Sequence, residues 1–265
     1  MGWGTGFALL LGCEFTVIAL SVFAFAGPYQ EDFLSPRLGF VLIAAGSLAA
    51  CAVPAPVAAP PGRERIAPAV DAFAEEIARF EAADRITPPR AGGVLFVGSS
   101  SIRLWPGLAS DFPGVYTLQR GFGGSELSDV IRYAPRIVLP YRPRLIVLYA
   151  GDNDLAAGES PASVFRDFQA FAQLVWRSLP ETRIAYIAIK PSGSRWGLVD
   201  QMREANDLIR CYAATDKRLV FVDVFTPMIG PDGKPREELF VADRLHLSAK
   251  GYALWKEVLW PVVSQ

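Results

Sequence analysis

The sequence predicts an α/β domain in which an open parallel sheet of about five strands lies between two layers of helices. The first observation is a set of short apolar runs without polar alternation, as expected for strands that are covered on both faces. They lie at residues 94–97, 115–118, 145–149, 184–189 and 219–224. The second observation is that helical patterns separate most of these runs, which favours parallel strands joined by right-handed crossovers.

The helices are predicted from apolar residues at helical spacing. Residues 71–85 form one such pattern, with Phe73, Ile77 and Phe80 on one side. Further patterns predict helices at residues 126–138, 162–179, 198–213 and about 248–258. In a sheet of this kind, ligands bind beyond the carboxyl ends of the strands. The residues that follow each strand are therefore the candidates for chemistry.

The N-terminal part has a different composition. Residues 5–26 are apolar apart from Glu14 and a few small polar residues, and they are long enough to span a bilayer of about 30 Å. A second apolar run covers residues 38–53, and a Pro/Ala-rich linker follows it. We therefore divide the chain into membrane-anchoring segments (1–53), a linker (54–66) and a folded domain (67–265).

Two interpretations of the N-terminal part remain open. Both apolar runs can be transmembrane helices that form a hairpin. Alternatively, Arg37 begins a leader, and the segment LAAC that ends at Cys51 resembles a bacterial lipoprotein cleavage site with Cys51 as the lipid anchor. The positive-inside rule does not decide between them, because Arg37 precedes the second run and Arg63 and Arg65 follow it. Either way, we expect a domain tethered to the membrane of a bacterial cell envelope, outside the cytoplasm.

Composition excludes several classes of function. The net charge of −1 provides no basic field for nucleic acid. The single histidine and the absence of an HExxH motif provide no zinc site, and neither dinucleotide-binding nor phosphate-binding glycine motifs are present. We expect no metal and no cofactor. Two of the three cysteines lie in the apolar runs, so no disulfide framework is implied, and Cys211 is expected to be a core residue.

Three strand ends carry polar or glycine-rich segments. After the first run comes GSSS (98–101), which places a hydroxyl at the start of a helix, either as a reactive group or as a simple N-cap. After the second, a loop with three glycines ends at Gly124 and can provide a backbone N–H to an oxyanion, or can be a turn. After the third, GDND (151–154) offers the Asn153 amide as a donor, or an Asx turn.

A fourth segment, DRLH, precedes the last predicted helix and contains the only histidine. Asp243 lies three residues before His246 and can hold its imidazole in one tautomer, as a catalytic base requires. A lone histidine can equally have a structural role. Because the chain has one histidine, any histidine-dependent catalysis must use His246.

These four segments, in this order, resemble the Ser, Gly, Asn and His blocks of the SGNH hydrolase family, also called GDSL-type esterases and lipases. The resemblance covers roughly residues 92–255. It implies a three-layer, flavodoxin-like sheet with Ser100 as the nucleophile, His246 as its base and Asp243 as the orienting acid. It also implies an oxyanion hole formed by Ser100, Gly124 and Asn153.

The sequence departs from the family pattern at two positions. The usual GDS is GSS here, with Ser99 in place of the aspartate, and the run of serines leaves Ser99 and Ser101 as alternative nucleophiles. Gln119 stands where the family often has asparagine. The GxSxG motif of α/β-hydrolases is absent.

The expected function is a serine esterase that acts on lipid or short-chain acyl esters. A carbohydrate O-acetylesterase or O-acyltransferase that acts on envelope glycans is the first alternative, and an inactive binding protein is the second. Five residues near the strand ends are candidates for substrate binding: Trp105, Arg120, Phe122, Arg195 and Trp196. An ester substrate and the membrane are the expected partners, and the sequence does not indicate an oligomeric state.

Overall fold

The computed structural model describes residues 71–265. The two predicted apolar segments, the whole linker and Cys51 lie outside the described residues, so those predictions remain untested. Within residues 71–265, no helix combines the length and apolarity that a membrane span requires.

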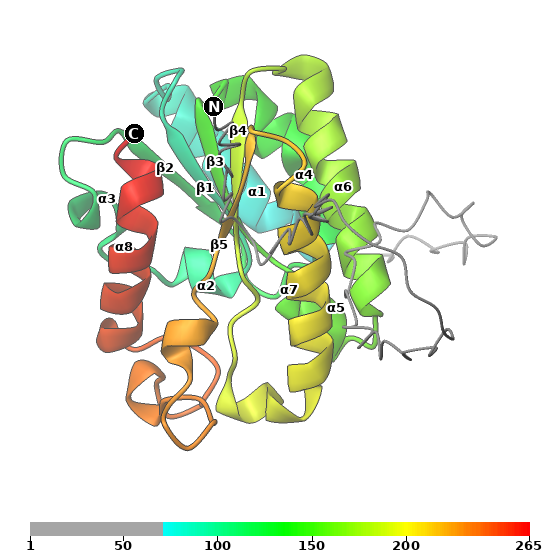
Figure 1. The fold of residues 1–265 in the computed structure, drawn as a ribbon. Helices are drawn as coiled ribbons and strands as arrows, with labels where there is room; N and C mark the ends of the chain where they lie inside the picture. The colour runs from blue at the N-terminus through cyan, green and yellow to red at the C-terminus, as the bar shows by residue number, and fades with distance from the viewer. Residues whose placement is uncertain (1–70) are drawn as a thin grey trace, which may run out of the picture. The chain divides into compact units, whose positions relative to one another are not determined.

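Five parallel strands form one sheet in the order β2-β1-β3-β4-β5, which confirms the predicted open sheet (Figure 1). The order reverses between β1 and β3, and such a switch point opens a crevice beyond the strand ends. The strands are β1 (Val94–Gly98), β2 (Thr117–Gly121), β3 (Leu145–Tyr149), β4 (Arg183–Ile187) and β5 (Leu219–Val222).

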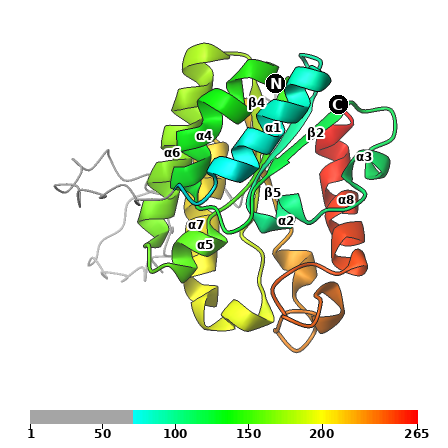
Figure 2. The ribbon, with the colours of Figure 1, turned by 180° about the vertical axis from the view of Figure 1, so that it is seen from behind.

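Helices cover both faces of the sheet, as Figures 1 and 2 show from opposite sides. One face packs against four helices: α1 (Ala74–Ile86), α4 (Leu127–Ile137), α6 (Pro161–Ser178) and α7 (Val199–Ala213). The other face packs against α8 (Ala249–Val263) and the short helices α2 (Ser100–Arg103) and α3 (Leu108–Asp111). The two hydrophobic cores therefore lie on opposite sides of the sheet.

The remaining elements are short. The one-turn helix α5 (Asp152–Ala156) follows β3, and four 3-10 helices lie in the connections. These are η1 (Leu139–Tyr141), η2 (Gly193–Leu198), η3 (Thr226–Met228) and η4 (Glu237–Leu239).

Local sequence explains the ends of the long helices. The Ser160 hydroxyl accepts the N–H of Ser163 at the start of α6, and Pro161 occupies the first turn, where a missing N–H costs nothing. Ser248 caps α8 in the same way. Helix α8 continues beyond the predicted end at residue 258, because Leu259 and Val263 are also buried in the core.

Strand β2 is the element that the sequence prediction misplaced. The apolar run at residues 115–118 predicted a strand there, whereas the observed strand is Thr117–Gly121, in register with β1 from Thr117 opposite Val94. The error arose from the polar residues at its end. Gln119 donates its side-chain amide to the carbonyl groups of Ile102 and Trp105, so a polar residue fits within this edge strand.

Candidate active site

Gly98 ends strand β1 and directs the chain out of the sheet towards Ser100. Its φ is +132°, and a Cβ atom there would lie 1.9 Å from the carbonyl oxygen of Tyr149 on the neighbouring strand β3. Only glycine tolerates both the conformation and this contact. The segment that carries Ser100 therefore leaves the sheet at the switch point between β1 and β3.

The three consecutive serines differ in burial and in partners. The side chains of Ser99 and Ser101 are 1% exposed, and their hydroxyls form no hydrogen bond among the described residues. Ser100 is partly exposed, and its Oγ lies 3.0 Å from Nε2 of His246. Among the three, Ser100 is thus the serine that a base contacts and a substrate can reach.

His246 and Asp243 lie on one loop between η4 and α8. Nδ1 of His246 is 2.6 Å from Oδ2 of Asp243. The other carboxylate oxygen of Asp243 accepts the backbone N–H groups of Leu245 and His246, each at 2.9 Å. A proton on Nδ1 is favoured by the carboxylate, which leaves the lone pair of Nε2 facing the Ser100 hydroxyl.

The Asp243 carboxyl is held in its charged form. Partial desolvation acts to raise its pKa, but the hydrogen bonds from the His246 side chain and from the two backbone N–H groups outweigh it and lower the pKa to about 2. The Asp243 side chain is 47% exposed and that of His246 is 28% exposed. This part of the site therefore lies open to water.

The loops that follow β2 and β3 bring Gly124 and Asn153 to the same edge of the sheet. Gly124 has a φ of +83°, and a Cβ atom there would meet nothing within 4 Å. Asn153 donates Nδ2–H to the carbonyl of Ser125 at 2.9 Å, and the N–H of Leu127 donates to Oδ1 of Asp154 at 2.9 Å. These two hydrogen bonds fasten the loop of Gly124 and the start of α4 to helix α5.

Asp154 was not singled out from the sequence. Burial is the main cause that raises its pKa, to about 7, and the hydrogen bond from Leu127 opposes that effect. Its Oδ2 has no hydrogen-bond partner among the described residues. Asp154 is therefore a buried acid whose charge changes near neutral pH.

Sequence reasoning also missed a buried group of charged residues behind Asn153. Oδ2 of Asp152 lies 3.0 Å from Nζ of Lys190 and 3.1 Å from Nη1 of Arg195. Nη2 of Arg195 donates to Oδ1 of Asn153 at 2.8 Å, and Nζ of Lys190 donates to the Tyr149 hydroxyl at 3.0 Å. The signal that could have revealed this group is a lysine directly after an apolar strand.

The pKa directions fit a charged carboxylate at the centre of this group. Burial acts to raise the pKa of Asp152, but the positive charges of Lys190 and Arg195 lower it below the ordinary value. Burial lowers the pKa of Lys190, and the charge of Asp152 opposes that effect. Lys190 and Arg195 therefore depend on the same carboxylate to compensate their positive charges, and Asp152 depends on them to remain charged while buried.

Three of the five residues predicted to bind substrate are core residues, which corrects that prediction. Trp105 is 1% exposed and packs among aromatic rings, with its N–H donated to Asp111. Phe122 is completely buried. Arg120 is 7% exposed, donates to the Tyr141 hydroxyl and pairs with Asp84.

The other two candidates lie in η2, which follows β4 and the buried Lys190. Arg195 is occupied by Asn153 and Asp152, with 19% of its side chain exposed. Trp196 is half-buried and remains a candidate for substrate contact.

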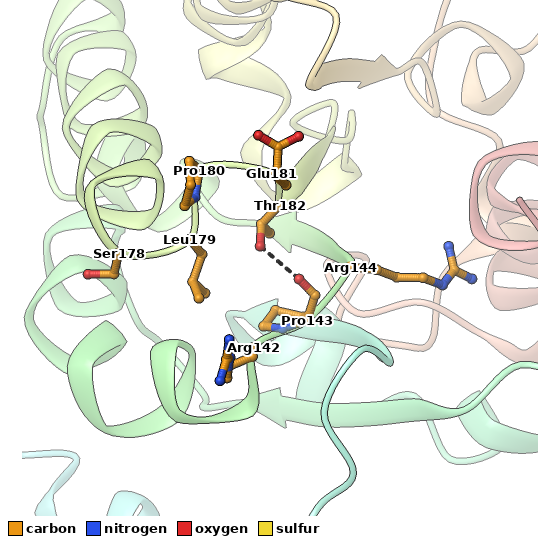
Figure 3. Close-up of a pocket in the computed structure, with 8 residues that line it drawn as sticks. All are labelled: Arg142, Pro143, Arg144, Ser178, Leu179, Pro180, Glu181 and Thr182. Carbon is orange, nitrogen blue, oxygen red and sulfur yellow. Dashed lines mark hydrogen bonds between the residues drawn. The ribbon is translucent and has the colours of Figure 1, made fainter.

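One pocket lies away from Ser100, Asp243 and His246, at the amino-terminal ends of β3 and β4 (Figure 3). A hydrogen bond from the Thr182 hydroxyl to the Pro143 carbonyl, 2.8 Å long, closes part of it. His246, the only histidine of the chain, contacts Ser100 beyond the carboxyl end of β1, so this pocket has no serine–histidine pair. Its lining residues are Arg142, Pro143, Arg144, Ser178, Leu179, Pro180, Glu181 and Thr182.

Comparison with known proteins identifies the family of this chain. The family model described as "GDSL-like Lipase/Acylhydrolase family" matches residues 94–254, which is more than half of the chain. The chain therefore belongs to the GDSL-like lipase/acylhydrolase family, the SGNH hydrolases that its sequence motifs resemble. It is an ester-hydrolysing enzyme. No match was found among curated proteins.

Solved structures with the same fold come from several bacteria. A protein described as a platelet activating factor from Streptococcus pneumonia is 22% identical, with a TM-score of 0.63 over 71% of this chain and 92% of its own. A GDSL-like lipase from Bacteroides thetaiotaomicron is 18% identical, with a TM-score of 0.61 over 71% and 97%. An acetylxylan esterase from Geobacillus stearothermophilus is 13% identical, with a TM-score of 0.54 over 66% and 95%.

Proposed function

We propose that this enzyme hydrolyses carboxylic esters through a covalent intermediate on Ser100. One observation carries the proposal: Oγ of Ser100 lies 3.0 Å from Nε2 of His246, whose Nδ1 lies 2.6 Å from Oδ2 of Asp243. A nucleophile, a base and an orienting acid within hydrogen-bond reach are what nucleophilic catalysis by serine requires.

The reaction proceeds in two halves. As Oγ of Ser100 attacks the ester carbonyl, Nε2 of His246 takes the hydroxyl proton, and Asp243 stabilises the imidazolium. The C–O bond of the tetrahedral intermediate breaks, and the leaving alkoxide takes the proton from His246 to depart as an alcohol. His246 then removes a proton from water, the hydroxide attacks the acyl-Ser100 carbonyl, and the carboxylic acid leaves as Ser100 regains its proton.

The negative oxygen of the tetrahedral intermediate needs donors that are already in place. We assign the backbone N–H groups of Ser100 and Gly124 and the side-chain amide of Asn153 to this role. Each donor of this kind contributes about 3 kcal/mol to the stabilisation of the transition state. Supporting the assignment, Gly124 has open space on the side where a Cβ would lie, and the Asn153 amide is fixed by two hydrogen bonds.

The acyl chain length is the property of the substrate that the experiment below has to determine. Burial of Trp105 and Phe122 removes two aromatic side chains from the site. Exposed apolar side chains remain on the segments that carry the proposed triad, with Leu104 41% exposed and Val241 46% exposed. We propose lipid or short-chain acyl esters as substrates, and acetylated carbohydrate as the alternative that an experiment must separate.

The first experiment measures hydrolysis by the full chain of p-nitrophenyl acetate, butyrate, octanoate and palmitate, and of acetylated xylooligosaccharide. We expect Ser100→Ala to abolish turnover and Ser101→Ala, a matched change one residue away, to retain it. Preference for longer chains supports a lipid ester, and activity on acetyl groups alone supports the carbohydrate alternative. Full activity of Ser100→Ala would disprove the assignment of the nucleophile.

We also propose that the N-terminal apolar segments tether the enzyme to a membrane, which the composition of residues 5–26 and 38–53 supports. Expression of the full chain in a bacterium, followed by fractionation, tests this proposal. Recovery in the membrane fraction is expected. A mobility change in Cys51→Ser would favour lipidation, and unchanged processing would favour the helical hairpin.

A further inference from the structure

The Asn153 carboxamide is held at both of its ends. Its Oδ1 accepts Nη2–H of Arg195 at 2.8 Å, and its Nδ2 donates to the carbonyl of Ser125 at 2.9 Å. A primary amide has two N–H groups, so one N–H remains for an oxyanion. Because oxygen and nitrogen of a carboxamide have nearly the same size, only hydrogen-bond partners decide which of them faces the substrate.

Arg195 can decide this orientation because it has donors and no acceptor. A guanidinium beside Asn153 is compatible with Oδ1 and incompatible with the amino group. The Ser125 carbonyl, which only accepts, requires the amino group on the other side. The two partners therefore enforce one orientation of the amide.

Arg195 is in turn held by buried charges. Its Nη1 lies 3.1 Å from Oδ2 of Asp152, which also lies 3.0 Å from Nζ of Lys190. The side chain of Lys190 is 1% exposed and that of Asp152 is 7% exposed. Burying such charges is costly, and this packing leaves Arg195 little freedom to turn away from Asn153.

The backbone beside Arg195 is also tied to the loop of the base. The N–H of Ser194 donates to the carbonyl of Arg244 at 3.1 Å, and Arg244 lies between Asp243 and His246 in the sequence. Arg195 therefore lies where the two halves of the proposed site meet, and its contacts run to Asn153 and Asp152.

We propose that Arg195 is a positioning residue that fixes Asn153 as an oxyanion donor, and that Asp152, itself paired with Lys190, holds Arg195 in place. The inference rests on the proposed esterase function and deepens it. Arg195 acts through Asn153, in contrast to the direct contact with substrate that the sequence suggested. Its guanidinium also withdraws electron density from the carboxamide, which makes the remaining N–H a stronger donor.

A double-mutant cycle on the full chain distinguishes the two roles, with p-nitrophenyl butyrate as the probe. We expect Asn153→Ala to lower kcat by about 100- to 1,000-fold. Arg195→Met should lower kcat by about 10- to 100-fold, as misplacement of a catalytic group does, with little change in KM. In the Asn153→Ala background, Arg195→Met should have almost no further effect, because residues that act through each other are not additive.

A direct contact with substrate predicts a different pattern. Arg195→Met would then raise KM, and its effect would multiply with that of Asn153→Ala. Either result would overturn the positioning role, as would an unchanged kcat in Arg195→Met.

Arg195→Lys provides a second variant should Arg195→Met fail to fold. Lysine retains a donor for Oδ1 of Asn153, so kcat should lie between those of the wild type and Asn153→Ala, and the loss should again disappear in the Asn153→Ala background. Arg166→Met is the control, because Arg166 lies at the exposed surface of α6, where it donates to the Ser163 hydroxyl, and it should match the wild type.

The two levels of the proposal fail in different ways. Active wild type, inactive Ser100→Ala and fully active Arg195→Met would refute the positioning role and leave the esterase proposal intact. Wild-type enzyme that neither hydrolyses an ester nor reacts with a fluorophosphonate at Ser100 would refute both.

Discussion

Two aspartates organise the two halves of the proposed site in opposite ways. Asp243 is 47% exposed and holds His246 through hydrogen bonds within a single loop. Asp152 is 7% exposed and pairs with two cations from the segment that follows β4, one of which contacts Asn153. The proposed base, His246, therefore stands in contact with water, whereas the proposed oxyanion donor, Asn153, is supported by buried charge.

The difference follows from what each half must do. A base that transfers protons to an alcohol and from water has to remain accessible to both. An oxyanion donor is most effective when its dipole is already oriented and the surroundings respond little. Breaking a buried ion pair is costly, so the buried pairs of Asp152 tie the support of Asn153 to the core, whereas His246 is held by the half-exposed Asp243.

The largest fall in kcat is expected from substitutions in the water-exposed half of the proposed site, at Ser100 and His246. Ser100→Ala and His246→Ala should each lower kcat by about 10⁶-fold, and the double variant should be no worse, because the two residues act as a unit. Burst and steady-state kinetics with p-nitrophenyl acetate measure this. Multiplicative losses would indicate that the two side chains act independently.

A smaller loss is expected from Asp243→Ala. His246 would keep its place beside Ser100 but lose the acceptor that fixes its tautomer, so kcat should fall by about 10⁴-fold. The Tm should fall only modestly, because the hydrogen bonds that lower the pKa of this carboxylate are lost but the group is half exposed and the bonds lie within one loop. A large fall in Tm would contradict the description of this loop as locally organised.

Substitutions in the buried half of the proposed site, around Asp152, should chiefly lower the free energy of unfolding. Asp152→Asn leaves Lys190 without a countercharge and should lower the free energy of unfolding by about 3–5 kcal/mol in urea titrations. Asp200→Asn is the matched control, since Asp200 is 91% exposed and pairs with Arg203 at the surface. Adding Lys190→Met to Asp152→Asn should restore part of the loss, and a further decrease would argue against unpaired charge as its cause.

The smallest effect concerns Asp154 and pH. Its pKa of about 7 in the folded protein exceeds the ordinary value of 3.8, so the native state retains a proton that the unfolded state has lost between these values. Stability should therefore fall as pH rises from about 4 to about 7 and level off above it, with about 1 kcal/mol of the fall between pH 6 and pH 8. Asp154→Asn should remove this contribution, and an identical pH profile in both proteins would count against the shift.

Sequence patterns predicted most of the sheet because its central strands are apolar on both faces. Strand β3 was predicted with its observed bounds, since Leu145 to Tyr149 are all buried. Strand β2 was misplaced because its end contains Gln119 and Arg120, which are accommodated by partners from other elements. Pattern alone does not report such long-range compensation.

The same reasoning explains which site residues were found. Ser100, Asn153, Asp243 and His246 lie in short motifs, and the distances among Ser100, Asp243 and His246 agree with the expected constellation, although the catalytic roles remain predictions. Trp105 and Phe122 were assigned to the substrate site because they follow strands, but the chain turns inward at both.

The partners of Arg195 were out of reach of local patterns for a different reason. Asp152 and Lys190 are 38 residues apart in the sequence, and no local motif near either residue predicts a contact with the other. Only the parallel pairing of β3 with β4 brings the segments that follow them together. A role that depends on sheet order becomes visible once that order is known.

The two hydrogen bonds that join the Gly124 loop and the start of α4 to α5 also bear on the order in which the parts of the proposed site form during synthesis. Both hydrogen bonds join residues that precede β4, and they can form as soon as β1, β2 and β3 have paired. His246 comes much later along the chain, just before α8 packs onto the opposite face. In the proposed mechanism, the oxyanion donors Gly124 and Asn153 are therefore synthesised before the base His246, and hydrolysis becomes possible only once that final loop has been made.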